Sequence, residues 1–410
     1  MSAPNQQSQP TETIQSKGSS RTGWYAAIAI VIVVVIVFAG LYAAGYIGKK
    51  TTSTTPVVGA CTSVTILGAG STFVEQLQDE WASVYTTGIV DYDAVGSGAG
   101  IADITDKTVT YGASDAPLNS TQTAALPDPV LTMPETAGAV SVIFNLPGVI
   151  FPLGYSLNVT GAILASIYLG DITTWNNSAI TAINPSMLHD GVPIAAVNTT
   201  IVAYHRSDGS GTSYAFSQFL SDSSATWKSA IGYSTLPDWP KFSSAVGAKG
   251  SSGIAGGVKD TPDSIGYVDL GEAANNVLSY AAVENPAGHY VIPTVNDTLS
   301  AITDILKTVS LPAGNASWSN VSMINAPGAK DYPISTFSYM LFYVAANDNP
   351  VVTSLTYAST FANWLNWTVT KGQAYSADLS YIPLPAAVVS ADQATIASMT
   401  YNGASIPACS

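Results

Sequence analysis

Three short segments of this sequence combine glycine with serine or threonine in a pattern suited to anion binding. They are Gly68–Phe73, Gly96–Gly100 together with Gly112–Asp115, and Arg206–Thr212. Each follows a predicted strand and opens a predicted helix, and a helix N-terminus offers unpaired N–H groups and the positive end of the helix dipole. Glycine lets the backbone approach a ligand closely, hydroxyl groups add donors, and Arg206 adds a charged fork. Converging turns of this kind would surround a tetrahedral oxyanion with hydrogen bonds.

A glycine- and serine-rich turn before a helix more often serves only as a cap, so the interpretation depends on the combination of segments. Thr72 and Glu75 also fit a capping box. The nucleotide fingerprint G-x-x-x-x-G-K-[ST] is absent, and the sequence has no H-E-x-x-H, C-x-x-C or G-x-S-x-G signal. We therefore expect a protein that is not an enzyme and holds no cofactor and no metal. The histidines are His189, His205 and His289.

Strands and helices are expected to alternate along the chain. Residues 74–85 carry apolar side chains at a helical period, and residues 140–145 form a run rich in β-branched side chains. The predicted strands are 63–67, 89–95, 108–113, 140–145, 201–204 and 265–270, and the predicted helices are 74–85, 160–169 and 214–220. Such alternation predicts an α/β fold with mainly parallel or mixed sheets.

The glycine-rich segments also carry a family resemblance. The chain resembles the phosphate-binding proteins of phosphate ABC transporters (PstS-type) at Gly68–Phe73, Gly96–Gly100, Gly112–Leu118, Thr160–Trp175, Arg206–Thr212 and Thr261–Leu270. The resemblance covers most of residues 63–345, with the motifs in the family's order. It implies a bilobed periplasmic-binding-protein type II fold, in which two mixed-sheet α/β lobes close over the ligand about a hinge.

Carried over position by position, the resemblance implies a set of phosphate ligands. Those of the first lobe are Thr72, Phe73, Ser97 and Asp115, and those of the second are Arg206, Ser210, Gly211 and Thr212. Asp208 matches an aspartate that pairs with the arginine. The departures from the family pattern are His205 in place of a second basic residue, Val74 in place of proline and Ser71 in place of alanine. The histidine could weaken the local positive potential, and the other two changes are expected to be benign.

A carboxylate inside an anion site has a physical rationale if the ligand carries a proton. At neutral pH phosphate retains an O–H group that can donate to Asp115, whereas sulfate has none and would face an unpaired negative charge. A buried polar group left without a partner costs about 1–3 kcal/mol, and more if it is charged. Asp115 would thus select phosphate by excluding sulfate. The competing interpretation is that Asp115 caps the turn through Ala116-Pro117, a common role of aspartate.

The composition is acidic but poor in charge. The formal net charge is -14, while 10% of residues are charged and 47% are hydrophobic. This argues against nucleic acid as a partner, because phosphate backbones are bound by clustered Lys and Arg. It does not exclude a small anion, which backbone N–H groups and one arginine can hold. An acidic external habitat is a further hypothesis, since a charge-poor surface gains little net charge there.

The N-terminal region predicts a membrane anchor. Residues 1–21 are predicted to be a disordered tail, 22–47 one transmembrane helix and 48–60 a polar linker. About 20 apolar residues span a bilayer as a helix, whereas a cleaved signal peptide, the competing interpretation, has an apolar core of about 7–15 residues. Basic residues on both sides leave the orientation of the span open: Lys17, Arg21, Lys49 and Lys50.

Two features place the rest of the chain outside the cell. Cys61 and Cys409 lie at the two ends of the region after the span, where an oxidising exterior would favour a disulfide over free thiols. Asn-x-Ser/Thr sequons, the acceptors of N-linked glycans, occur only beyond the span. They begin at Asn119, Asn158, Asn176, Asn198, Asn296, Asn315, Asn320 and Asn366.

We expect the chain to run from lobe 1 (61–140) to lobe 2 (141–328) and back to lobe 1 (329–410), through hinge strands near 136–145 and 325–335. The resemblance then implies a monomeric, extracellular, membrane-anchored glycoprotein that binds inorganic phosphate and delivers it to an ABC permease. Two alternatives remain. One is a binding protein for another tetrahedral oxyanion such as sulfate or molybdate; the other is a structural surface glycoprotein, which would leave the glycine-rich segments unexplained.

Overall fold

The computed structural model of the protein describes residues 61, 64–151, 156–196 and 198–409. The described residues all belong to one compact unit, Val57–Ser410. The predicted tail (1–21), membrane helix (22–47) and linker (48–60) lie outside the described residues. Of the helices that are described, none is both long and apolar enough to cross a membrane.

Strands and helices alternate in the described region, as predicted. The strands are β1 (Thr65–Gly70), β2 (Ile89–Asp93), β3 (Tyr111–Ser114), β4 (Val130–Asn145), β5 (Val149–Ile150), β6 (Asn158–Val159), β7 (Leu188–His189), β8 (Val192–Pro193), β9 (Val202–Arg206), β10 (Ala245–Ala248), β11 (Ser264–Asp269), β12 (Ser279–Tyr280), β13 (Ala282–Glu284), β14 (Tyr290–Val291), β15 (Ser335–Tyr343), β16 (Thr400–Tyr401) and β17 (Ala404–Ser405). The helices are α2 (Glu75–Val84), α3 (Ser97–Thr105), α4 (Ser120–Ala125), α5 (Gly161–Leu169), α6 (Ser178–Ile183), α7 (Gly211–Ser223), α8 (Ala225–Ala230), α9 (Gly250–Asp260), α10 (Leu270–Asn275), α11 (Val295–Leu306), α12 (Leu355–Val369) and α13 (Ala386–Ala397).

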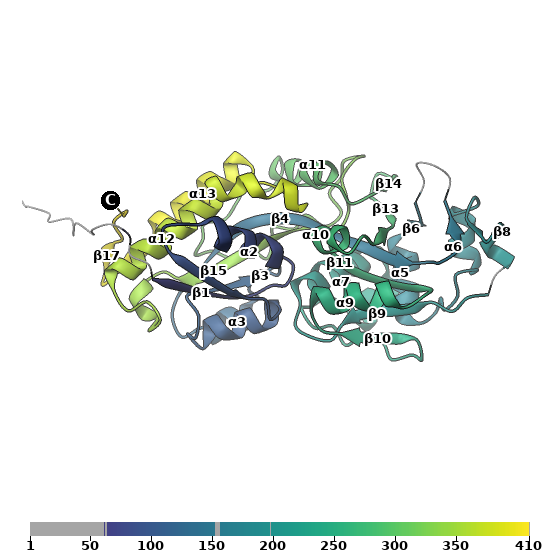
Figure 1. Ribbon diagram of the computed structural model, residues 1–410, viewed down its shortest axis with the longest axis horizontal. Helices are drawn as coiled ribbons and strands as arrows, with labels where there is room; N and C mark the ends of the chain where they lie inside the picture. The colour runs from purple at the N-terminus through teal and green to yellow at the C-terminus, as the bar shows by residue number, and fades with distance from the viewer. Residues whose placement is uncertain (1–60, 62–63, 152–155, 197, 410) are drawn as a thin grey trace, which may run out of the picture. The chain divides into compact units, whose positions relative to one another are not determined.

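One mixed sheet organises these elements. Its strands run in the order β10-β9-β11-β4-β15-β3-β1-β2, and β12 also pairs with β4. Strand β1 is parallel to β2 and β3, and β9 is parallel to β10 and β11. Strands β4 and β15 are antiparallel to their partners. Helices α12 and α13 lie on one side of the β1-β3-β15 part of the sheet and α3 lies on the other (Figure 1).

The long strand β4 changes partner along its length. Residues 130–139 pair with β15, whereas residues 140–145 pair with β11. We call lobe 1 the part with β1, β2, β3, β15 and the first segment of β4, and lobe 2 the part with β9, β10, β11 and the second segment. All of 131–144 is buried, because both faces of the strand are covered. The bilobed mixed α/β fold expected from the sequence is confirmed.

Aromatic side chains pack against one another within each lobe, in a buried core that is continuous through both. In lobe 1, Trp81 and Tyr85 of α2 pack edge-on against Trp364 of α12, with ring centroids 6.2 and 4.9 Å apart. In lobe 2, Phe216 of α7 stacks on Tyr267 of β11 at 4.3 Å. A fully buried large apolar side chain contributes about 1.5–3 kcal/mol. Each lobe can therefore hold its own set of loops in a fixed geometry.

A disulfide joins Cys61 to Cys409, with their Cα atoms 5.2 Å apart. The predicted pairing is confirmed, and it ties together the two ends of the unit Val57–Ser410. In the chain-entropy model a cross-link closing so long a loop contributes up to about 5 kcal/mol.

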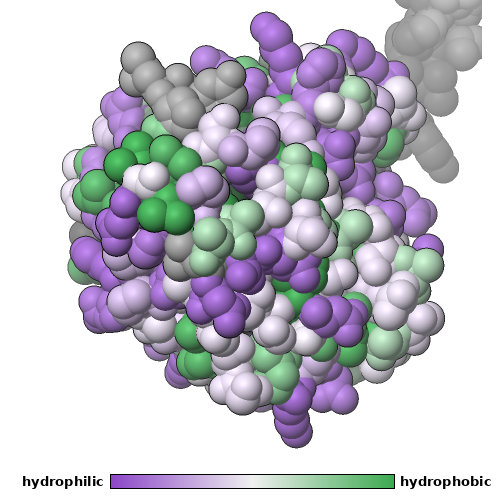
Figure 2. Space-filling view, turned by 90° about the vertical axis from the view of Figure 1, so that its right-hand side faces the viewer, coloured by the Kyte–Doolittle hydropathy of each residue, from purple (hydrophilic) through white to green (hydrophobic). Residues whose placement is uncertain are grey.

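One corner of lobe 2 exposes large apolar side chains. Val277 is 90% exposed and Ile150 is 62% exposed, and the neighbouring Val149 lines the same cavity as Val277. Figure 2 shows a face of the molecule on which hydrophobic residues gather beside mainly hydrophilic ones. Val277 also has a φ of 56°, a left-handed conformation that strains a β-branched residue. This corner shares no residue with the glycine-rich segments.

Three buried carboxyl groups bind protons unusually tightly. Glu135 lies in β4, Asp269 ends β11 and Asp392 lies in α13, and each is at most 1% exposed. Burial raises the pKa of Glu135 and of Asp269 to about 8, and that of Asp392 to about 9. The folded chain therefore holds protons over a pH range in which the unfolded chain has lost them.

We expect the midpoint of thermal unfolding to fall as the pH is raised from about 5 to about 9. Each group has a folded pKa above its unfolded value, so its contribution is fully present below about pH 4 and is lost as the pH rises through about 8 to 9. Differential scanning calorimetry without reductant measures the midpoint. Asp392→Asn should flatten the upper part of the curve, because an amide cannot ionise. A midpoint that stays constant or rises would contradict these shifts.

Candidate functional site

The predicted glycine-rich segments meet where the two lobes face each other. Gly211 N, at the start of α7, donates to Ser97 Oγ, at the start of α3, over 3.0 Å. Thr72 Oγ1, just before α2, lies 3.0 Å from Ser251 Oγ, at the start of α9. These segments follow β1, β2, β9 and β10 in the chain. Helix N-termini from both lobes therefore face one region, as the binding of an oxyanion requires.

Glycine allows the lobes to meet at backbone distance. Gly98 N donates to the carbonyl oxygen of Gly209 over 2.8 Å. A Cβ atom added to Gly98 would lie 2.9 Å from Gly209 Cα, and one added to Gly211 would lie 2.5 Å from Asp115 Cβ. Side chains at these positions would hold the lobes apart. The glycines thus permit a close approach between lobes as well as local turns.

Arg206 is the positively charged side chain of this region, and it is 1% exposed. Its Nε donates to Asp208 Oδ1 over 2.7 Å, and its Nη2 donates to Asp208 Oδ2. Its Nη1 donates across the lobes to Thr72 Oγ1 over 3.0 Å. Burial alone would raise the pKa of Asp208, but the hydrogen bonds and charge of Arg206 hold it below its ordinary value. The guanidinium is thereby fixed by lobe 2 while it reaches lobe 1.

Asp115 lies on the lobe 1 side and is also 1% exposed. Ser71 Oγ lies 2.7 and 2.8 Å from its two carboxylate oxygens and donates to them. Burial raises the pKa of Asp115 to about 6, and hydrogen bonds from Ser71 and Ser338 and the charge of Arg206 limit the rise. The group is therefore mostly ionised at neutral pH, yet it binds a proton readily. It is suited to accept a hydrogen bond from a protonated ligand.

Residues 210–212 begin α7 and present hydroxyl groups to the same region. Ser210 Oγ accepts from Ser213 N over 3.1 Å as the helix N-cap, so its own O–H remains free to donate. Thr212 Oγ1 is buried and has no hydrogen-bond partner among the residues that the structure describes. An unpaired buried hydroxyl is costly, and an oxygen of a bound anion could pair with it.

The predicted capping box of Thr72 and Glu75 is wrong. Helix α2 starts at Glu75 with Val74 as its N-cap, and no side chain caps it. The Thr72 hydroxyl lies too early in the chain to cap and instead accepts from Ser251 N over 3.2 Å. Phe73 N, predicted to bind the anion, donates to Ser71 Oγ over 3.0 Å in this structure.

The turn that follows Asp115 has a different cap. Ser114 Oγ accepts from Ala116 N over 3.1 Å, so a capping role does not account for Asp115. His205 is half-buried and stacks on Trp239, with centroids 5.0 Å apart. Burial lowers its pKa, so the ring is neutral at pH 7 and adds no positive potential.

Two contributors to the site were not predicted from the sequence. Ser71 was expected to be a benign departure, but it holds the Asp115 carboxylate. The start of α9 was not recognised, although Gly250 N donates to Asp208 Oδ1 over 3.1 Å and Ser251 contacts Thr72. A signal was present, because Gly250 and Ser251 follow a strand and open a helix as the other segments do.

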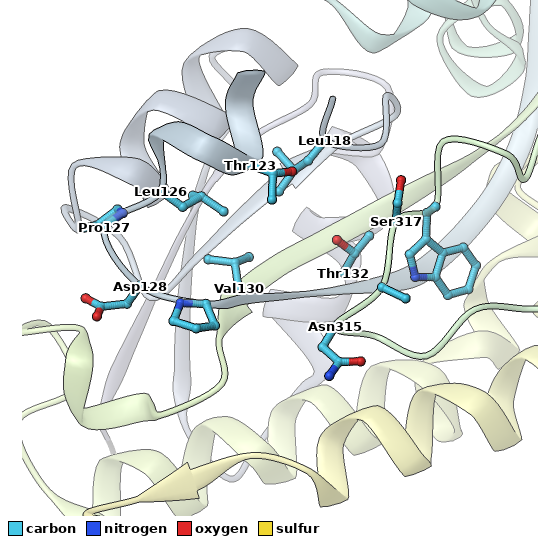
Figure 3. A pocket seen from close by; sticks show the side chains of 12 residues that line it. Leu118, Thr123, Leu126, Pro127, Asp128, Val130, Thr132, Asn315 and Ser317 are labelled. Carbon is cyan, nitrogen blue, oxygen red and sulfur yellow. The ribbon is translucent and has the colours of Figure 1, made fainter. Parts of the chain in front are cut away.

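Cavity volume does not identify this region. A cavity of about 410 Å³ opens elsewhere in lobe 1, and residues such as Leu118, Thr123 and Val130 line it (Figure 3). The space beside Asp115 measures only about 10 Å³. Within the described part of the chain, no group of three or more His, Cys, Asp or Glu could hold a metal ion. The converging donors are therefore the better guide to the site.

Comparison with known proteins gives a consistent result. The family model of the PBP superfamily domain matches residues 51–371. The phosphate-binding protein PstS of Xylella fastidiosa is 35% identical over 346 residues, which are 81% of this chain and 85% of that protein. The phosphate-binding protein PstS of Haemophilus influenzae is 33% identical over 333 residues, 79% of this chain and 90% of that protein.

A solved structure shares the fold. It is a high-affinity periplasmic phosphate-binding protein (PfluDING) bound with phosphate, which is 21% identical to this chain. The TM-score is 0.65, and the match covers 84% of this chain and 96% of that one.

We expect Arg206→Ala to weaken the binding of inorganic phosphate by more than about tenfold, because a hydrogen bond to a charged group is worth about 1.5–3 kcal/mol. Isothermal titration calorimetry of the purified protein measures the affinity. Lys259→Ala is the matched control, since it removes a positive charge from the exposed end of α9 in the same lobe. Equal affinities for Arg206→Ala and the unmodified protein would refute the site.

Proposed function

Because the chain belongs to the PstS family of phosphate-binding proteins, we propose that it binds inorganic phosphate between its two lobes and delivers it to the permease of an ABC importer. The observation that carries the proposal is a buried carboxylate, Asp115, placed among hydrogen-bond donors of both lobes. Donors alone would suit any oxyanion. A carboxylate among them suits an oxyanion that still carries a proton.

We assign the ligand contacts as the sequence predicts them. Lobe 1 supplies Thr72, Phe73, Ser97 and Asp115, and lobe 2 supplies Arg206, Ser210, Gly211 and Thr212. In support, Ser97 Oγ accepts from Asp115 N over 3.3 Å and from Gly211 N over 3.0 Å, which leaves its own proton for a ligand oxygen. The unpaired hydroxyl of Thr212 offers a further donor. Asp208 orients the Arg206 guanidinium and partly neutralises its positive charge.

Selectivity follows from the proton. An ionised Asp115 accepts the O–H of phosphate, whereas fully deprotonated sulfate would bring a second unpaired negative charge against it. Sulfate, molybdate and a purely structural role are therefore disfavoured as alternatives. The assigned residues bind and orient, and the proposal includes no chemical step.

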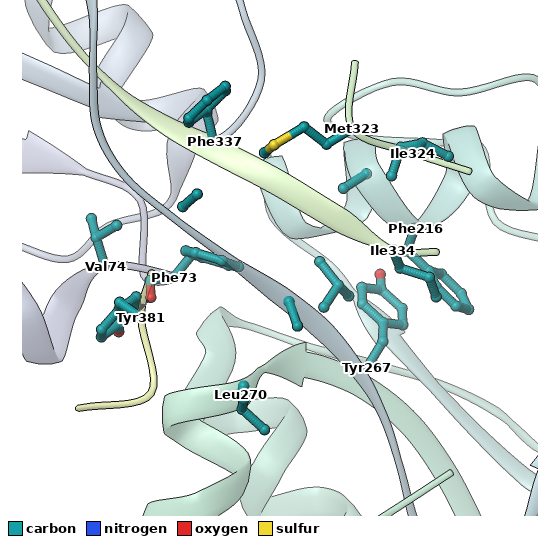
Figure 4. Close-up of a cluster of buried hydrophobic side chains, with 14 of the residues drawn as sticks. Phe73, Val74, Phe216, Tyr267, Leu270, Met323, Ile324, Ile334, Phe337 and Tyr381 are labelled. Carbon is teal, nitrogen blue, oxygen red and sulfur yellow. Dashed lines mark hydrogen bonds between the residues drawn. The ribbon is translucent and has the colours of Figure 1, made fainter. Parts of the chain in front are cut away.

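Ligand binding would be coupled to closure of the lobes about β4 and β15. We propose lobe boundaries at 61–140, 141–328 and 329–410, with hinges near 136–145 and 325–335. In support, β4 pairs with β15 up to Ala139 and with β11 from Val140 onward. Buried side chains, among them Phe73 and Tyr267, pack on both sides of the joining strands (Figure 4).

We further propose that residues 22–47 anchor a monomer to the cell membrane, with the binding lobes outside. The apolar length of this segment supports the anchor. The disulfide supports an oxidising location, since such bonds persist outside the reducing cytosol. Six sequon asparagines are exposed and available to glycans, namely Asn119, Asn198, Asn296, Asn315, Asn320 and Asn366. Asn158 and Asn176 are half-buried and are weaker candidates.

The test is a calorimetric titration of anion-free protein with phosphate and then with sulfate at pH 7. Saturable one-to-one binding of phosphate with little response to sulfate is expected. Sulfate binding as tight as phosphate binding would overturn the role given to Asp115. No binding of either anion by folded protein would overturn the function.

Asp115→Asn should narrow the ratio of phosphate to sulfate affinity by at least about tenfold, because an amide neither repels sulfate nor selects for a ligand proton. The same titration measures both affinities. Asp106→Asn, which removes a carboxylate from the exposed end of α3, should leave the ratio unchanged. An unaltered ratio in Asp115→Asn would show that this carboxylate does not discriminate.

A further inference from the structure

Glu135 occupies an irregular position in the long strand β4. Ser338 of β15 pairs with Thr136, but the next residue, Tyr339, pairs with Pro134, so Glu135 is the extra residue of a β-bulge. Bulges re-aim a side chain and are frequent beside functional sites. The Glu135 side chain is 0% exposed. The β-bulge thus directs the Glu135 carboxyl group into the interior of lobe 1.

Neutral side chains satisfy this carboxyl group. Gln78 Nε2 donates to Glu135 Oε2 over 2.5 Å, and Ser338 Oγ lies 3.0 Å from Glu135 Oε1. Gln78 is itself held by Tyr111, whose hydroxyl donates to Gln78 Oε1 over 2.8 Å. In the described part of the chain, no Lys, Arg or His forms an ion pair with Glu135. A buried carboxyl group in such surroundings favours its neutral, protonated form.

Ser338 connects Glu135 to the anion site. Its neighbour Tyr339 pairs with Ser114 between the antiparallel strands β15 and β3, which places Ser338 opposite Asp115. The Ser338 hydroxyl also lowers the pKa of both carboxyl groups. Burial raises the pKa of Glu135 to about 8, and the negative charge of Asp115 contributes to this rise. The pKa of Asp115 itself rises only to about 6. Asp115 faces the charge of Arg206, whereas no salt bridge in the described part of the chain involves Glu135, so ionisation is favoured at Asp115 and protonation at Glu135.

A hydroxyl group has one proton to donate, so the state of Glu135 decides where Ser338 donates it. The separation of 3.0 Å between Ser338 Oγ and Glu135 Oε1 suits donation in either direction. If Glu135 is protonated, it can donate to Ser338, and Ser338 is then free to donate to Asp115. If Glu135 is ionised, it accepts the hydrogen bond from the Ser338 hydroxyl, so Ser338 no longer donates to Asp115. The ionised Glu135 also places a second negative charge behind Asp115.

We propose that Glu135 is a positioning residue of the phosphate site, which in its protonated form directs the Ser338 hydroxyl to Asp115 and keeps Asp115 as the ionised acceptor of the ligand's proton. The inference rests on the proposed function and deepens it. Phosphate specificity then depends on two carboxyl groups, one in contact with the ligand and one behind it that stores a proton.

The other titratable groups around Glu135 do not change charge near neutral pH. Tyr111 is buried and Tyr92 is half-buried, and desolvation raises both pKa values well above the ordinary value. Tyr381, which also senses the charge of Glu135, behaves in the same way. The positive charge of Arg206 lowers the pKa of Asp115.

Three further acids lie on elements packed against β4. Asp269 ends β11, with Glu272 in the following helix α10, and Asp392 lies in α13. Burial raises the pKa values of Asp269 and Asp392 to about 8 and about 9, so they titrate in the same range as Glu135. Neither is in hydrogen-bond contact with Glu135 or Ser338. Asp392 is therefore a matched control for the titration of a buried carboxyl group.

The test compares Glu135→Gln with the unmodified full-length protein by calorimetric titration with inorganic phosphate from about pH 6 to about pH 9. The ratio of the two affinities at each pH cancels the ionisation of phosphate itself. Glutamine mimics protonated Glu135, so the ratio should be within about twofold at the lower pH. Near the upper pH the variant should bind at least about fivefold tighter, because only the unmodified protein gains a buried negative charge behind the site. In Asp392→Asn the ratio should be constant throughout.

Ser338→Ala provides a second test that does not depend on the folding of Glu135→Gln. It removes the bridge but keeps both carboxyl groups, so the pKa of Asp115 should rise. We expect the ratio of phosphate to sulfate affinity at pH 7 to fall by at least about fivefold. If the role of Ser338 were purely structural, the substitution would weaken the binding of phosphate and of sulfate equally. The ratio of the two affinities would then not change.

The results distinguish a failure of the role proposed for Glu135 from a failure of the proposed phosphate-binding function. A Glu135→Gln ratio that is independent of pH would overturn the role of Glu135, even if the unmodified protein binds phosphate tightly. Should that variant not fold, an unchanged phosphate-to-sulfate ratio in Ser338→Ala would overturn it. If the unmodified protein binds no phosphate at any pH, the proposed function itself fails.

Discussion

An anion that enters a closed protein interior must exchange its water shell for fixed donors, and this requirement shapes the region between the two lobes. Donors come from four helix starts, which supply N–H and hydroxyl groups without adding charge. Arg206 contributes a full positive charge, but its fork already engages Asp208, and Asp115 stands opposite. Hydrogen bonds to the anion therefore contribute most of its binding free energy, and the net charge of the site contributes little.

The same requirement explains why glycine is placed where the lobes touch. Donors from two lobes can surround one small ion only if the backbones come within van der Waals contact. At Gly98 and Gly209 the nearest obstacle to an added Cβ is the other lobe's backbone, at 2.9 Å in both directions. Neither segment needs glycine for a left-handed φ at these two positions. Contact between lobes, and not turn geometry, is the constraint on them.

Much of this arrangement could be predicted from the sequence, because strand-turn-helix units have strong local signals. The segments around Ser97 and Arg206 were identified in this way, and the structure places them face to face. The role of Thr72 could not be read locally, since its partners Arg206 and Ser251 lie far along the chain. The β-bulge at Glu135 was also hidden. Strand β4 is buried on both faces, so it lacks the alternation from which register is normally inferred.

The buried acids also change the meaning of the chain's acidity. The formal charge of -14 counts Glu135, Asp269 and Asp392 as ionised, although burial raises their pKa values to about 8 or 9. The folded protein is therefore less negative at neutral pH than its composition states. For a protein that attracts an anion this is an advantage, because long-range repulsion falls with the net charge. Protonated carboxyl groups thus have two effects. Those far from the site lower the overall negative charge of the protein. At Glu135 the protonated group supplies a hydrogen-bond donor, where an ionised group would have repelled the ligand.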